Sequence, residues 1–203
     1  MSRSLVIMLH GVGSNGNDLA PLGDIWRPNL PETGFVAPDA PFPFEQGPGR
    51  QWFSITGVTE HNRPERVAAA RAAFDATLTG LMAENGLAGQ PERVVLLGFS
   101  QGSIMALDAV VSGRWQLAGV VAFSGRLSSP APLTPPAHLP VLLIHGAQDP
   151  VISPQETERA ALTLEGLGVA VTSFILPGLG HSLNAEGVAT AGRFIVGALR
   201  PGQ

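Results

Sequence analysis

The pentapeptide Gly98-Phe99-Ser100-Gln101-Gly102 has the residue types and the spacing that can present a nucleophilic serine. An apolar run at residues 93–97 precedes it, and an apolar segment of helical character follows at residues 103–107. A strand, a tight turn and a helix in this order expose a serine hydroxyl at the end of a sheet, and glycines leave room for the turn. The pattern therefore predicts that Ser100 attacks an acyl carbon.

A serine hydroxyl is a weak nucleophile at neutral pH and needs an adjacent base, which in this setting comes after an acid along the chain. We expect His181 to be that base, because it precedes the last helical segment and follows a glycine-rich loop at residues 177–180. His145 follows an apolar strand directly and is the main alternative. We interpret His145 as a partly buried loop residue that forms local hydrogen bonds.

The acid must lie between Ser100 and His181, where the aspartates are Asp108 and Asp149. Asp108 falls in the helix after the serine, about 12 Å along its axis from the active edge, and we expect it to pair with a neighbouring residue. Asp149 lies just beyond the apolar run 141–144, at the correct edge of the sheet. It is predicted to accept the imidazole N–H and to stabilise the imidazolium.

Acyl transfer also needs hydrogen-bond donors for the oxyanion that develops during attack. The backbone N–H of Gln101, directly after the serine, is one predicted donor. The other is predicted to be the N–H of Val12, in the loop His10-Gly11-Val12-Gly13 that follows the first apolar run. His10 is interpreted as a structural residue of this loop.

A rival motif overlaps the same loop. Residues 11–16 read G-x-G-x-x-G after a strand, and Asp39 lies about 23 residues further on, as in a dinucleotide-binding fingerprint. This pattern would predict an oxidoreductase that uses a nicotinamide cofactor. Against it, the third glycine should open a full helix, and prolines interrupt the interval before the next strand at Pro21, Pro28 and Pro31.

Apolar runs of strand length recur along the chain, and most are continuous rather than alternating, which is typical of parallel strands covered on both faces. They lie at residues 5–9, 35–37, 93–97, 117–123, 141–144 and 171–176. Helical patterns at about 64–85 and 184–199 separate or follow them. We therefore predict an α/β fold with a mainly parallel central sheet, helices on both faces, and long loops at 38–49 and 128–140.

Composition limits the partners. The chain has 203 residues, 44% hydrophobic and 14% charged, and all 12 of its basic residues are arginines, with a formal net charge of −4. Without a basic run, nucleic acid is not an expected partner. The absence of cysteine excludes disulfides and thiolate metal sites. No segment reads as a secretory leader or membrane span, so a cytoplasmic protein is expected.

Together these motifs resemble the phospholipase/carboxylesterase family of α/β-hydrolases, which includes acyl-protein thioesterases and bacterial carboxylesterases. The resemblance runs nearly end to end. It is carried by residues 9–13, 37–41, 50–53, 98–102, 122–125, 145–151 and 180–181. Residues 47–53 resemble a bacterial branch more than the eukaryotic thioesterases, which argues against protein depalmitoylation.

The resemblance implies a single α/β-hydrolase domain over residues 1–203. It implies hydrolysis of carboxylic esters or thioesters of small to medium acyl groups through an acyl-enzyme, with no cofactor and no metal. It also implies the triad Ser100, Asp149 and His181 with oxyanion donors at Val12 and Gln101, and it allows a homodimer. The alternative from another class is a catalytically silent ligand-binding protein on this fold, which an incomplete triad would favour.

The substrate-binding residues are predicted from an aromatic cluster in the loop over the active edge. The cluster consists of Phe42, Phe44, Trp52 and Phe53. Two interpretations stay open for it: an apolar wall that binds the acyl group, or a satellite core beneath a long loop.

Overall fold

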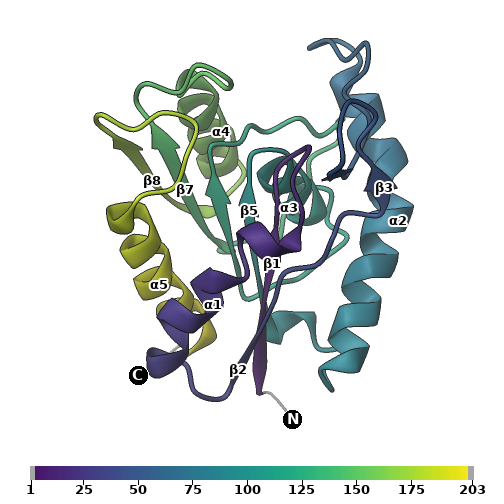
Figure 1. Ribbon diagram of the computed structural model, residues 1–203. Coiled ribbons are helices and arrows are strands. Elements are labelled where there is room, and N and C mark those ends of the chain that lie inside the picture. Colours follow the sequence, from purple (N-terminus) through teal and green to yellow (C-terminus); the bar gives the residue numbers. More distant parts are fainter. Residues whose placement is uncertain (1–2, 201–203) are drawn as a thin grey trace.

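Residues 3–200 are described by a computed structural model, and their centre is a six-stranded sheet in the order β2-β1-β5-β6-β7-β8 (Figure 1). Every neighbouring pair in this sheet is parallel. The predicted α/β class with a parallel sheet is therefore confirmed. The strands are β1 (Ser4–Leu9), β2 (Thr33–Val36), β5 (Val94–Phe99), β6 (Gly119–Phe123), β7 (Pro140–Gly146) and β8 (Ala170–Leu176).

Helices cover both faces of the sheet (Figure 1). One face packs against α2 (Arg63–Glu84), α3 (Gln101–Val111) and α4 (Gln155–Gly166). The other packs against α1 (Pro21–Trp26) and α5 (Ala185–Leu199). Short 3₁₀ turns lie at Gly16–Asp18, Arg27–Asn29 and Pro91–Arg93.

The continuous apolar run of β1 is explained by this three-layer arrangement. Leu5, Ile7 and Leu9 belong to the core beneath α2, α3 and α4, whereas Val6 and Met8 belong to the core beneath α1 and α5. All five side chains are buried. Since successive side chains of a strand point to opposite faces, a strand covered on both sides has no polar positions to alternate with.

Two local elements differ from expectation. The prolines after the first loop were expected to interrupt a full helix opened by Gly16, and a 3₁₀ turn follows Gly16 instead, but the sequence patterns did not indicate the separate six-residue helix α1, which begins at Pro21. Proline is tolerated in the first helical turn because the N–H that it lacks would have no partner there. Within and just after the predicted loop 38–49, β3 (Phe42–Pro43) and β4 (Arg50–Gln51) form a short antiparallel pair.

The parallel sheet brings distant loops to one edge. The carboxyl ends of β1, β5, β7 and β8 all lie at the same side of the molecule (Figure 1). Four connections begin at these strand ends: the loop after Leu9, the turn at Ser100, the turn after Gly146 and the loop 177–184. Open α/β sheets bind their ligands at this edge. Among residues 3–200, no helix is both long enough and apolar enough to cross a membrane.

A buried ion-pair cluster joins α2 to α3 away from this edge. The carboxylate of Asp108 is fully buried and accepts hydrogen bonds from Arg71 Nε at 2.9 Å and Arg71 Nη2 at 2.8 Å. It also accepts one from Arg114 Nη1 at 2.8 Å, and Arg114 extends the cluster to Asp75. Burial raises the pKa of Asp108, but the hydrogen bonds from both arginines outweigh it, so the pKa lies below its ordinary value. Asp108 is a structural residue.

We predict that Asp108→Ala lowers the free energy of unfolding by about 3 kcal/mol, because it leaves two partly buried guanidinium groups without their carboxylate. Urea unfolding measures this loss. The matched control is Arg159→Ala, which removes the exposed ion pair with Glu156 and should cost less than about 1 kcal/mol. Equal losses in the two variants would contradict the assignment.

Candidate active site

Ser100 occupies the sharp turn between β5 and α3, with φ 53° and ψ −115°. This left-handed backbone is costly for a residue with a side chain and persists only when its surroundings impose it. They do so here, because Ser100 N–H donates to Phe123 O at 2.9 Å. A Cβ at Gly98 would lie 2.4 Å from the Gly102 carbonyl carbon, and one at Gly102 would lie 2.0 Å from Leu9 O. Only glycine fits beside this turn.

Three side chains from separate loops meet at the sheet edge. The hydroxyl oxygen of Ser100 lies 2.9 Å from His181 Nε2, and His181 Nδ1 lies 2.6 Å from Asp149 Oδ2. The ring of His181 packs against Phe99, with 4.9 Å between ring centroids. The structure thus brings together the three residues predicted as a triad. In this geometry the imidazole can take the serine proton while the carboxylate stabilises the resulting cation.

The carboxylate of Asp149 is buried, and backbone hydrogen bonds also hold its second oxygen, Oδ1. Asp149 Oδ1 accepts the N–H of Val151 at 2.8 Å and of Ile152 at 3.0 Å. Burial raises the pKa of Asp149, but hydrogen bonds from His181, Ile152 and Val151 outweigh this effect and hold the pKa below its ordinary value. Asp149 is therefore ionised at neutral pH. Its charge keeps the proton of His181 on Nδ1 and leaves Nε2 free to accept the serine proton.

The two residues predicted to supply backbone oxyanion donors, Val12 and Gln101, lie near Ser100. Gln101 is the first residue of α3, and the N–H groups of a first helical turn have no partner within the helix. Val12 belongs to the loop after β1 and lines the same cavity as Ser100. Its N–H donates to no acceptor in the part of the chain that the structure describes. The role of these two N–H groups as oxyanion donors stays a prediction.

His10 holds the loop that carries Val12. Its Nδ1–H donates to Gly11 O at 2.7 Å, and its Nε2 accepts the N–H of Ala40 at 2.9 Å. The indole N–H of Trp52 donates to the carbonyl of His10 at 2.9 Å. Burial lowers the pKa of His10 from its ordinary value of 6.5, so the neutral ring is retained. A protonated ring could not accept from Ala40, which makes His10 a structural residue of the loop.

The side chain of Gln101 has a role that the sequence did not reveal. Its Oε1 accepts the N–H of Trp52 at 2.8 Å, and its Nε2 donates to Phe53 O at 2.7 Å. The amide therefore pairs with the backbone like a neighbouring strand and ties the segment 52–53 to the nucleophile turn. Only the backbone of Gln101 was predicted to matter. The only signal in the sequence was the position of a glutamine directly after Ser100.

A cavity of about 500 Å³ opens onto Ser100 and His181. Apolar side chains form much of its wall: Val12, Leu19, Phe99, Val151 and Leu183. None of the four aromatic residues predicted to bind substrate is among its described lining residues. Trp52 is buried in the core against Phe74, with ring centroids 5.5 Å apart. Phe44 lies close to Gly13 and Gly47.

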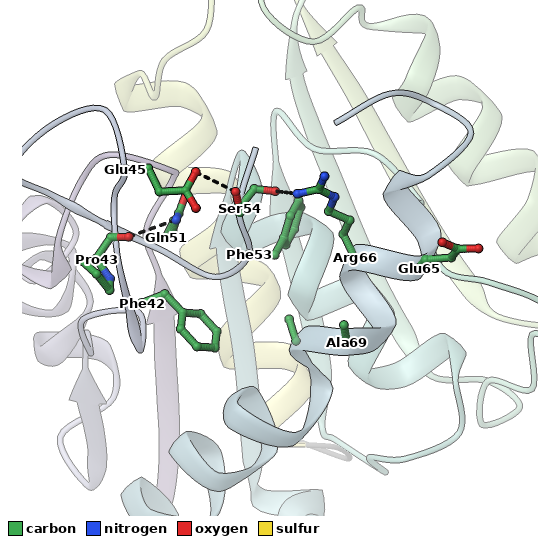
Figure 2. Close-up of a pocket in the computed structure, with 10 residues that line it drawn as sticks. Phe42, Pro43, Glu45, Gln51, Phe53, Ser54, Glu65, Arg66 and Ala69 are labelled. Atoms are coloured by element: carbon green, nitrogen blue, oxygen red, sulfur yellow. Dashed lines mark hydrogen bonds between the residues drawn. The ribbon is translucent and has the colours of Figure 1, made fainter. Parts of the chain in front are cut away.

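The other two aromatic residues, Phe42 and Phe53, line a second cavity between the β3–β4 hairpin and α2, about 600 Å³ in volume (Figure 2). Several of its polar residues are paired with one another. Glu45 accepts the hydroxyl of Ser54 at 2.7 Å, and Arg66 donates to the Ser54 carbonyl at 3.2 Å (Figure 2). This cavity contains none of the triad residues.

The residues of the rival dinucleotide-binding motif form hydrogen bonds within their own loop. The N–H of Gly16 donates to Asp39 Oδ1 at 2.8 Å, so the acid predicted to bind a ribose instead holds the third glycine. A 3₁₀ turn of three residues, Gly16–Asp18, follows in place of a full helix. Without that helix the loop lacks the dipole and the N–H groups that bind a pyrophosphate.

Comparisons with known proteins agree with the family resemblance that the sequence motifs indicate. A sequence profile described as Phospholipase/Carboxylesterase matches residues 1–198. Esterase YpfH of Escherichia coli is 34% identical over 183 residues, covering 90% of this chain and 78% of its own. Acyl-protein thioesterase 1 of Gibberella zeae is 29% identical over 216 residues, covering 97% and 91%. The crystal structure of esterase PE8 matches with a TM-score of 0.87 and 38% identity, covering 96% and 92%. The predicted α/β-hydrolase fold is confirmed.

We predict that His10 makes stability depend on pH. Because its pKa is lowered in the native state, the unfolded chain binds a proton near pH 6.5 that the native chain does not, so stability rises with pH. The free energy of unfolding should therefore fall between about pH 7 and pH 5, before Asp108 and Asp149 titrate. His10→Gln keeps an acceptor for Ala40 and should show a flatter profile. Identical slopes in denaturant titrations of the two proteins would rule out this role of His10.

Proposed function

The chain belongs to the phospholipase/carboxylesterase family. We therefore propose that it hydrolyses carboxylic esters or thioesters, with Ser100 as nucleophile, His181 as general base, and Asp149 as the carboxylate that orients and stabilises the His181 ring. The observation that carries this proposal is the continuous hydrogen-bonded chain from the Ser100 hydroxyl through both nitrogens of His181 to Asp149. A serine esterase or thioesterase is the activity class of this family.

The geometry supports a two-step reaction. His181 Nε2 removes the Ser100 proton as the oxygen attacks the acyl carbon, and the oxyanion faces the N–H groups of Val12 and Gln101. The tetrahedral intermediate collapses, and His181 gives the proton to the leaving alcohol or thiol. His181 then deprotonates a water that attacks the acyl-enzyme, which releases the acid and returns the proton to Ser100. Esters and thioesters share this path.

The size and lining of the cavity beside Ser100 determine the length of the acyl groups that we propose as substrates. Its volume of about 500 Å³ and its apolar lining suit small to medium acyl chains. Relatives named as esterase and as acyl-protein thioesterase are both similar to this chain. Cytoplasmic residence and a homodimer stay predictions of the sequence.

The alternatives have less support. A catalytically silent ligand-binding protein would not need the Ser100 hydroxyl, His181 and a buried Asp149 within hydrogen-bonding distance of one another. The oxidoreductase hypothesis is weakened, because the N–H of Gly16 donates to the carboxylate of Asp39, and both belong to the motif that would have contacted the cofactor.

We predict that Ser100→Ala reduces hydrolysis of a nitrophenyl ester and of an acyl thioester by at least about 10⁴-fold while the thermal midpoint stays nearly unchanged. Asp149→Asn should lower kcat by about 10⁴-fold, because the amide no longer fixes the imidazole proton on Nδ1. Ser173→Ala, on the exposed edge strand β8, is the control and should keep full activity. Ordinary turnover by Ser100→Ala would refute the proposal.

We predict that the acyl chain lies in the cavity beside Ser100. Leu183→Trp should narrow this cavity and lower kcat/KM for an octanoyl ester at least about tenfold more than for an acetyl ester. Phe42→Ala, in the second cavity, should leave this chain-length profile as in the wild type. The reverse result, a profile that changes with Phe42 and not with Leu183, would place the acyl chain in the second cavity.

A further inference from the structure

Trp52 forms hydrogen bonds with both segments that are predicted to supply the oxyanion donors. It lies directly after β4 and is buried, with 1% of its surface exposed. Its backbone N–H donates to Oε1 of Gln101, the first residue of α3, at 2.8 Å. Its indole N–H donates at 2.9 Å to the carbonyl oxygen of His10, two residues before Val12. The proposed reaction gives Trp52 no role, because it is not among the residues that line the cavity beside Ser100.

The indole ring of Trp52 is fixed by the core around it. It packs edge-on against Phe74 of α2, with 5.5 Å between ring centroids and 72° between ring planes. The centroid of the His10 ring lies 5.7 Å away on another side. The adjoining backbone is held as well, since Gln101 Nε2 donates to Phe53 O at 2.7 Å. Because protein interiors are close-packed, Trp52 is a rigid connection between His10 and Gln101.

The two segments that Trp52 connects touch each other at a glycine. A Cβ on Gly102 would lie 2.0 Å from Leu9 O and 2.8 Å from His10 O. This contact limits how closely α3 approaches the end of β1, but it does not prevent one segment from sliding along the other. Hydrogen bonds have a preferred direction, so the two bonds of Trp52 fix the position of the segments along the contact.

A pair of oxyanion donors needs such a fixed position. Each N–H must lie about 2.7–3.1 Å from the one oxygen that develops charge, and a misplacement of about 1 Å can cost about 10²-fold in rate. Val12 follows His10 in one segment, and the N–H of Gln101 belongs to the other. A shift of His10 relative to the start of α3 would therefore change the distance between the two donors.

We propose that Trp52 is a positioning residue for catalysis, whose two hydrogen bonds hold the N–H groups of Val12 and Gln101 at the separation that one oxyanion requires. This inference rests on the proposed function, because the oxyanion forms only when Ser100 attacks an acyl carbon. The donors act in the transition state, so their displacement lowers kcat and kcat/KM by the same factor.

Matched substitutions separate the indole donor from general stability. Trp52→Phe removes the indole N–H and keeps an aromatic ring in the core. Trp26→Phe is the control, because the indole N–H of buried Trp26 also donates to a backbone carbonyl, that of Val188, at 3.1 Å. Neither Trp26 nor Val188 lines the cavity beside Ser100. We expect Trp52→Phe to lower kcat about 10- to 100-fold with KM changed less than about twofold, and Trp26→Phe to keep kcat within about twofold of the wild type.

A transition-state analogue tests the donors directly. An alkyl trifluoromethyl ketone forms a tetrahedral hemiketal on a catalytic serine, and the oxyanion of this adduct accepts from the same N–H groups. We expect its inhibition constant to rise about 10- to 100-fold in Trp52→Phe and to stay within about twofold in Trp26→Phe. The alcohol of the same carbon skeleton forms no adduct, and its inhibition constant should stay within about twofold in both variants.

Gln101→Met removes the other hydrogen bond of Trp52 at equal side-chain length and keeps the backbone N–H of residue 101. We expect it to lower kcat and to weaken inhibition by the ketone over the same range. In the double variant with Trp52→Phe the losses should not multiply, because one remaining bond no longer fixes the separation of the donors. If Trp52→Phe does not fold, Gln101→Met decides the question with the same two measurements.

The outcomes distinguish this inference from the proposed function. Wild-type kcat, or an unchanged inhibition constant of the ketone, in folded Trp52→Phe while Ser100→Ala is inactive would overturn the positioning role alone. So would losses in Trp26→Phe as large as those in Trp52→Phe, losses that multiply in the double variant, or wild-type values in Gln101→Met where Trp52→Phe does not fold. Ordinary turnover by Ser100→Ala would instead overturn the assignment of the nucleophile.

Discussion

The left-handed backbone at Ser100 is the constraint on which the rest of the site depends. A chain that leaves β5 and enters α3 within one residue must turn sharply, and glycine at position 98 leaves room for the start of α3, while glycine at position 102 lets α3 approach the end of β1. The turn places Ser100 at the carboxyl end of β5, directly before the first residue of α3, whose N–H has no partner within the helix. The proposed nucleophile and one proposed oxyanion donor are therefore adjacent residues of a single backbone turn, stabilised by the surrounding fold.

Buried polar groups supply the remaining geometry. Each is paired in a definite direction: His10 between Gly11 and Ala40, the amide of Gln101 between Trp52 and Phe53, and Asp149 among its backbone and imidazole donors. In a low-dielectric interior an unpaired group is costly, so these pairings define one arrangement of the loops.

The sequence could predict a parallel sheet, the positions of its apolar strands along the chain and the meeting of Ser100, Asp149 and His181, because these follow from local spacing and from the rule that parallel strands end at one edge. The substrate wall could not be predicted in this way. An aromatic side chain in a loop can face a cavity or a core, and only tertiary contacts decide: Trp52 packs on Phe74, whereas Phe42 lines a cavity that contains none of the triad residues. Local patterns also missed α1, where proline is harmless in the first turn.

The central claim is that one serine is activated by its surroundings and no other is. The most direct measurement is the reaction of the intact protein with a fluorophosphonate, followed by mass spectrometry of its peptides. Our account predicts a single phosphonyl adduct, on the hydroxyl of Ser100, and parallel loss of ester hydrolysis. An adduct on another residue, or complete loss of hydrolysis with Ser100 unmodified, would contradict it.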